Sequence, residues 1–125
     1  MIISDYFKEV EQKIVETKII AEKKIDYKEF SSDEGMIRGK LLFINGYVLE
    51  FMEYVCIGKE RPKYRFNLMD KNGRIIFRYD NAPHHNHPNI STFPHHKHLP
   101  GEIEESKEKE FIEVLKEIET LALKI

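Results

Sequence analysis

Residues 63–80 read KYRFNLMDKNGRIIFRYD, and this stretch decides the fold. Its Asn72-Gly73 dipeptide is a strong signal for a tight β-hairpin, because both residues tolerate the positive φ angles that such turns need. Folding the stretch about this turn predicts four cross-strand pairs: Leu68 with Phe77, Phe66 with Tyr79, Asn67 with Arg78, and Arg65 with Asp80. Apolar residues then meet on one face and polar residues on the other. A slip of one residue would send every side chain to the wrong face, so the pattern predicts this register.

A second hairpin is predicted around Asn45-Gly46. The same two-residue turn would pair Ile44 with Tyr47, Leu42 with Leu49, Lys40 with Phe51, and Arg38 with Glu53. The last pair joins opposite charges. In one interpretation it is a surface ion pair that contributes less than about 1 kcal/mol to stability. In the other, this face continues into the face of Arg65 and Arg78, and Glu53 supplies a second carboxylate to a functional site there.

Helices are predicted at both ends of the chain. Ser4 is the expected cap of a first helix from about Asp5 to Lys13, in which apolar residues recur at helical spacing. Ser106 is the expected cap of a last helix. The apolar stripe of this last helix, which should cover the sheet, comprises Phe111, Val114, Leu115, Ile118, Leu121, Ala122 and Ile125.

The remaining segments predict one more strand, a turn and a loop. Residues 18–30 suit a half-exposed strand, although 21–24 could instead continue the first helix, and 31–35 should form a turn. Regular structure is expected to stop after Asp80, because Pro83, Pro88, Pro94 and Pro100 disfavour helix and ladder pairing. The predicted fold class is therefore α+β: a four- to five-stranded antiparallel sheet with N- and C-terminal helices and a histidine-rich loop after the last strand.

Length and composition bound the class of protein. A chain of 125 residues, 41% hydrophobic and 34% charged, is expected to form one domain over residues 1–125, with 81–100 as its functional loop. No apolar run is long enough to cross a bilayer, so no membrane partner and a cytoplasmic location are expected. Cys56 is the only cysteine, which excludes an internal disulfide and the cysteine-rich zinc modules.

Charge is distributed unevenly along the chain. Residues 59–78 carry seven cationic side chains against two carboxylates, whereas residues 101–125 carry eight glutamates against four lysines. A basic centre can attract phosphates even though the net charge of the whole chain is −2. The alternative is that the basic residues only form the solvated surface of a hairpin.

All six histidines follow the predicted hairpin, within a segment punctuated by prolines. They are His84, His85, His87, His95, His96 and His98. Histidine titrates near neutrality and is also a common metal ligand, so the cluster indicates either proton transfer or metal binding.

Proton transfer would suit cleavage of a phosphodiester bond. In that reaction a base deprotonates a ribose 2′-hydroxyl, an acid protonates the leaving oxygen and cations stabilise the developing charge. The catalytic candidates are His84, His85, His95, His96, His98, Asp80 and Glu53, with acid and base roles left open. The candidates for substrate binding are Arg38, Arg65, Arg78 and Asn81.

There are two alternatives to metal-free catalysis: metal binding and a non-catalytic role. His85-x-His87 and His96-x-His98 place alternate side chains on one side of an extended segment. The alternative metal ligands, for zinc or another divalent transition metal, are therefore His85, His87, His96, His98 and Asp80. In the other alternative the histidines only bind backbone groups of the loop, and the protein is a non-catalytic binding module.

Four strings of this sequence resemble the TumE family of toxins from type II toxin–antitoxin modules. They are DEGMIRGKLLF (33–43), LEFMEYV (49–55), RYDNAPHH (78–85) and FPHHKH (93–98). The resemblance implies a small growth-inhibiting protein that acts on RNA or translation and is neutralised by a partner antitoxin, with self-association left open. By motif match it points to Arg38, Glu53, Arg78, Asp80, His84, His85, His95, His96 and His98. Cleavage of RNA without a metal cofactor is the leading hypothesis.

Overall fold

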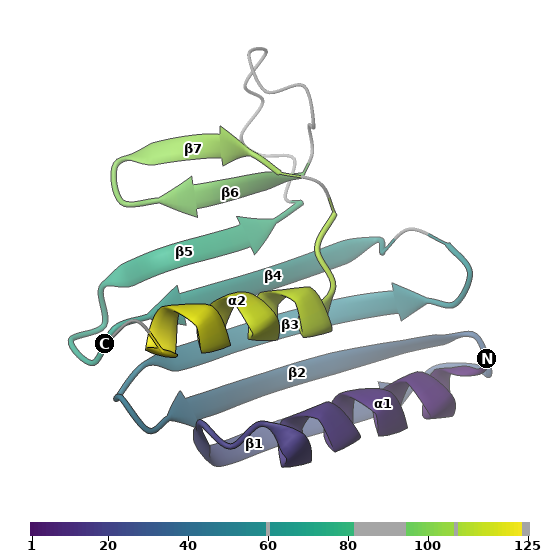
Figure 1. Ribbon diagram of the computed structural model, residues 1–125. Coiled ribbons are helices and arrows are strands. Elements are labelled where there is room, and N and C mark those ends of the chain that lie inside the picture. Colours follow the sequence, from purple (N-terminus) through teal and green to yellow (C-terminus); the bar gives the residue numbers. More distant parts are fainter. Residues whose placement is uncertain (60, 82–94, 107, 124–125) are drawn as a thin grey trace.

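The chain folds into one antiparallel sheet with two helices on the same face (Figure 1). The computed structural model describes residues 1–59, 61–81, 95–106 and 108–123. In chain order the elements are α1 (Ile3–Glu16), β1 (Ile20–Glu29), β2 (Glu34–Phe43), β3 (Val48–Cys56), β4 (Lys63–Met69), β5 (Ile75–Asp80), β6 (His96–Leu99), β7 (Glu102–Glu105) and α2 (Phe111–Leu123). The α+β class with terminal helices is confirmed. The sheet has seven strands in sequential order β1 to β7, rather than four or five.

The hydrophobic core lies between the sheet and the two helices. Alternate residues of β2 to β5 point toward the helices, and the largest fully buried side chains include Tyr64, Phe43, Phe66, Phe77 and Phe111. Gly35 allows α1 to approach β2, since a Cβ there would lie 2.7 Å from side-chain atoms of Ile3 and Phe7. None of the helices in the described ranges is long and apolar enough to span a membrane.

The four pairs predicted between residues 65 and 80 are all confirmed. The turn itself is longer than expected: the Asp70 amide donates to the Arg74 carbonyl at 2.8 Å, which leaves three residues in the loop. The register then shifts by one residue between Leu68 and Met69. This β-bulge offsets the longer turn, so the apolar and polar faces fall as predicted.

The register predicted for the β2–β3 hairpin is wrong by one residue. The Phe43 amide donates to the Tyr47 carbonyl at 2.9 Å, so this turn also has three residues, with Gly46 at a φ of 89°. No bulge follows here, and Arg38 faces Met52 while Glu53 faces Ile37. Arg38 and Glu53 therefore lie on opposite faces of the sheet and do not form the predicted ion pair.

Regular structure does not stop after Asp80. Strands β6 and β7 form a further hairpin, and Leu99 pairs with Glu102 across Pro100-Gly101. Gly101 has a φ of 80°, which fits the third position of a type II turn, while proline suits the second. The Pro-Gly dipeptide was therefore the sequence signal for this hairpin. His84, His85 and His87 lie outside the described residues.

The helix boundaries also differ from the prediction. Helix α1 begins at Ile3, where the Asp5 carboxylate accepts a hydrogen bond of 3.0 Å from the Ile2 amide, so Ser4 lies within the helix and is not its cap. Helix α2 begins at Phe111 rather than after Ser106. The strand predicted within residues 18–30 is confirmed as β1.

Candidate functional site on the open face of the sheet

Six residues form a continuous row across the sheet face opposite the helices. Each faces the next across a pair of neighbouring strands, from β1 to β6: Asp26, Arg38, Met52, Arg65, Asp80 and His96. A second row runs beside it: Lys24, Lys40, Glu50, Asn67, Arg78 and His98. Because same-face residues alternate with core residues along a strand, both rows belong to the surface that the two helices leave open (Figure 1).

Asp80 is the centre of a cluster at the β5–β6 end of these rows. Its Oδ1 lies 2.7 Å from Nε2 of His96, and its Oδ2 lies 3.3 Å from Nε2 of His98. Arg78 donates from Nε to the same Oδ2 at 3.0 Å. Asp80 and His96 are buried, whereas His98 is partly exposed. One carboxylate therefore lies within ion-pair distance of two imidazoles and is itself paired with a guanidinium.

This cluster suits two kinds of chemistry. In a neutral imidazole one ring nitrogen carries the proton and the other keeps a lone pair, which a general base requires. Alternatively, one ligand atom each from Asp80, His96 and His98 lies within 4.8 Å of the others, which is the spacing of a metal-binding set. Carboxylate and imidazole ligands suit zinc.

A cationic hollow adjoins the cluster. It has a volume of about 390 Å³ and is lined by Arg38, Met52, Lys63, Tyr64, Arg65, Arg78 and Asp80. The predicted substrate-binding residues Arg38, Arg65 and Arg78 are thus brought together beside Asp80. This is the arrangement expected of a surface that binds phosphate groups.

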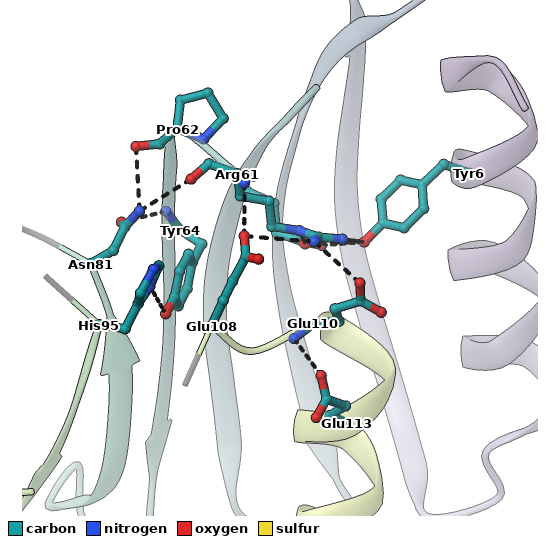
Figure 2. Close-up of polar contacts among 10 residues, drawn as sticks. Tyr6, Arg61, Pro62, Tyr64, Asn81, His95, Glu108, Glu110 and Glu113 are labelled. Atoms are coloured by element: carbon teal, nitrogen blue, oxygen red, sulfur yellow. Dashed lines mark hydrogen bonds and ion pairs between the residues drawn. The ribbon is translucent and has the colours of Figure 1, made fainter. Parts of the chain in front are cut away.

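His95 does not join this cluster. Its Nδ1 lies 2.9 Å from the hydroxyl of Tyr64, and the two rings stack with centroids 5.7 Å apart (Figure 2). Tyr64 belongs to the core on the helix side of the sheet, and part of the residue also lines the cationic hollow. His95 therefore contacts the covered side, while His96, the next residue along the chain, lies on the open face with Asp80.

The amide of Asn81 binds backbone groups (Figure 2). Its Oδ1 accepts a hydrogen bond of 3.0 Å from the Tyr64 amide, and its Nδ2 donates to the carbonyls of Arg61 and Pro62, both at 3.3 Å. Asn81 is buried. Through these hydrogen bonds it joins the end of β5 to the start of β4.

Glu53 lies on the helix side and pairs with Arg61, a residue that no local sequence pattern indicates. Its carboxylate is fully buried and accepts hydrogen bonds from Arg61 Nε at 2.6 Å and from the Tyr6 hydroxyl at 3.0 Å. Arg61 Nη2 also donates to the Tyr6 oxygen at 3.0 Å (Figure 2). Burial, followed by the Glu53 charge, raises the pKa of Tyr6. The phenol therefore stays protonated and donates a hydrogen bond to Glu53.

The comparison with known families supports the resemblance noted in the sequence. A family model described as Toxin TumE matches residues 8–122. Searches of curated proteins and of solved structures give no significant match.

Proposed function

Because the chain belongs to the TumE toxin family, we propose that it is the toxin of a toxin–antitoxin pair and acts as a metal-independent endoribonuclease. The family itself supports the toxin role and an antitoxin partner in general. Cleavage of RNA is our inference from the chemistry of the open face. The observation that carries it is one carboxylate, Asp80, within 3.3 Å of two imidazoles at the border of a cationic hollow.

The reaction needs a base, an acid and cations. A base removes the proton of a ribose 2′-hydroxyl, whose oxygen attacks the adjacent phosphorus. The bond from phosphorus to the 5′-oxygen breaks, and an acid protonates that oxygen, leaving a 2′,3′-cyclic phosphate and a 5′-hydroxyl. Arg65 and Arg78, which line the hollow, would stabilise the additional negative charge on the phosphate oxygens.

Exposure separates the roles of the two imidazoles beside Asp80. The His98 side chain is 13% exposed and the His96 side chain 2%. We therefore assign His98 to proton transfer with the substrate, and His96 together with Asp80 to its positioning. The second proton-transfer group would be His84 or His85, the sequence candidates outside the described residues.

Cleavage of a synthetic RNA by the purified protein in excess EDTA tests this function. H98Q should lower the rate by about 100-fold or more, the usual contribution of a general acid or base. R65Q should weaken cleavage, whereas R74Q removes the same charge from an exposed turn and should not. Thermal unfolding of each variant shows that it is folded. Wild-type rates in folded H98Q and D80N, or complete loss of wild-type activity in EDTA, would contradict the proposal.

The second candidate function is metal-dependent hydrolysis, favoured by the proximity of ligand atoms from Asp80, His96 and His98. On this alternative the protein should purify with about one equivalent of zinc or another transition metal, and D80N should lose it. Elemental analysis of the wild type and of D80N decides between the two. A metal content near zero in active wild-type protein excludes this alternative.

A further inference from the structure

We propose that the open face binds single-stranded RNA along a path that runs across the sheet from the Asp80 cluster on β5 and β6 to β1. This inference rests on the proposed function for its choice of ligand, because an endoribonuclease must hold RNA. It adds the substrate class and a binding surface that extends from the reacting groups toward β1, with Arg38 at its middle.

The path is a chain of adjoining hollows. The hollow beside Asp80 is followed by one of about 290 Å³, which shares Arg38, Met52 and Arg65 with it and extends to Lys24. A third, of about 350 Å³, is lined by Asp26, Lys28, Met36 and Arg38. Arg38 lines all three hollows, so it stands at the middle of the path.

The path is cationic along its whole length. Its basic side chains are Lys24, Lys28, Arg38, Lys40, Lys63, Arg65 and Arg78. Its acidic side chains are Asp26, Glu50 and Asp80. Lys40 lies 3.9 Å from Glu50, and Arg78 pairs with Asp80. In the described part of the chain no carboxylate lies within ion-pair distance of Arg38 or Arg65, so both guanidinium groups can bind phosphates.

An apolar floor between the cations favours a single strand over a duplex. Met52 lies between Arg38 and Arg65 in the cross-sheet row and is 8% exposed, and Met36 lines the far end of the path. Thioether side chains adapt to the faces of aromatic groups. A single strand can turn its bases onto such a floor while its phosphates contact the flanking cations, whereas a duplex keeps its base faces stacked inside.

The length of the path fits a short oligonucleotide. Neighbouring strands lie about 4.8 Å apart, so β1 and β6 are separated by roughly 24 Å. A span of that size holds several nucleotides, in keeping with the roughly 4 to 16 nucleotides bound by other single-strand-binding folds. The phosphate to be cleaved would lie at the β5–β6 end.

Binding can be measured separately from cleavage with a short 2′-O-methyl oligoribonucleotide, which lacks the attacking hydroxyl. Fluorescence anisotropy should show tighter binding of the single strand than of the blunt duplex of the same sequence. R38Q should weaken binding several-fold and lower the slope of log affinity against log salt by about one, as expected for the loss of one phosphate contact. The R74Q variant, with the same charge loss outside the path, should bind as the wild type does.

The double variant K24Q/K28Q tests the far end of the path at two exposed positions of the edge strand β1. It too should weaken binding of the single strand. Equal binding by R38Q and R74Q, or a duplex bound as tightly as the single strand, would overturn this inference. If the wild type binds the 2′-O-methyl strand as expected but does not cleave RNA, the binding path stands and the proposed function fails.

Discussion

The Arg61 guanidinium donates from Nε to Oε2 of Glu53 over 2.6 Å, and both side chains are buried beneath the helices. The pair ties the β3–β4 connection to α1, because the Tyr6 hydroxyl hydrogen-bonds to both members. Arg61 Nη1 also lies 3.4 Å from Glu110 Oε1, just before α2. One ion pair thus joins three segments that are distant in the sequence.

Removal of one partner should destabilise the fold strongly. R61M leaves the Glu53 carboxylate buried without its counter-ion, and the free energy of unfolding should fall by about 3–5 kcal/mol. Urea denaturation measures this loss, with K59M at an exposed position as the control. The double variant R61M/E53L removes the unpaired charge and should recover most of the loss. A double variant no more stable than R61M would show that the pair is not the cause.

Asn81 should act through the backbone rather than through substrate. N81D keeps the acceptor for the Tyr64 amide but points an oxygen at the carbonyls of Arg61 and Pro62. The free energy of unfolding should fall by about 1–3 kcal/mol, and less in acid, where the introduced carboxyl can donate a proton. Chemical denaturation at two pH values measures this, with N72D in an exposed turn as the control. Full stability of N81D combined with lost RNA affinity would instead return Asn81 to the binding surface.

Tyr79 should make the protein lose stability in alkali. Burial, followed by its hydrogen bond to Glu117, raises the pKa of Tyr79 from 10.0 to about 12. Between these values the folded state keeps a proton that the unfolded state releases, so the free energy of unfolding falls as pH rises through this window. Burial alone would lower the pKa of Lys97, but its hydrogen bonds to Tyr79 and Glu117 raise it. The contribution that Lys97 makes to the free energy of unfolding through its raised pKa is likewise lost as pH rises.

The variant Y79F isolates the tyrosine's part of this effect. The difference in melting temperature between the wild type and Y79F should shrink as the pH rises from about 9, below the usual pKa of tyrosine, to about 12. Circular dichroism melts across this range measure it. A constant difference would mean that the Tyr79 hydroxyl does not titrate differently in the folded and unfolded states.

Two hairpins with similar turns show where prediction from sequence succeeds. Both contain a three-residue loop where an Asn-Gly dipeptide favoured a two-residue one. The bulge between Leu68 and Met69 restores the predicted pairs in the β4–β5 hairpin. The β2–β3 hairpin has no such bulge beside its turn, so Arg38 and Glu53 lie on opposite faces. Turn length and bulges depend on how a hairpin packs in the sheet, and a short-range signal does not specify them.

The sequence by itself determined the elements with a clear local pattern. Alternation in residues 63–80 was enough to place Arg65, Arg78 and Asp80 on one face, because the side-chain period of a strand is a local property. Only the tertiary structure decided which distant groups meet them. Pairing of β6 with β5 places His96 and His98 beside Asp80. His95 instead contacts Tyr64, and Glu53 forms its ion pair with Arg61. Such contacts join residues far apart in the chain, so they follow from sheet pairing and core packing rather than from neighbouring residues.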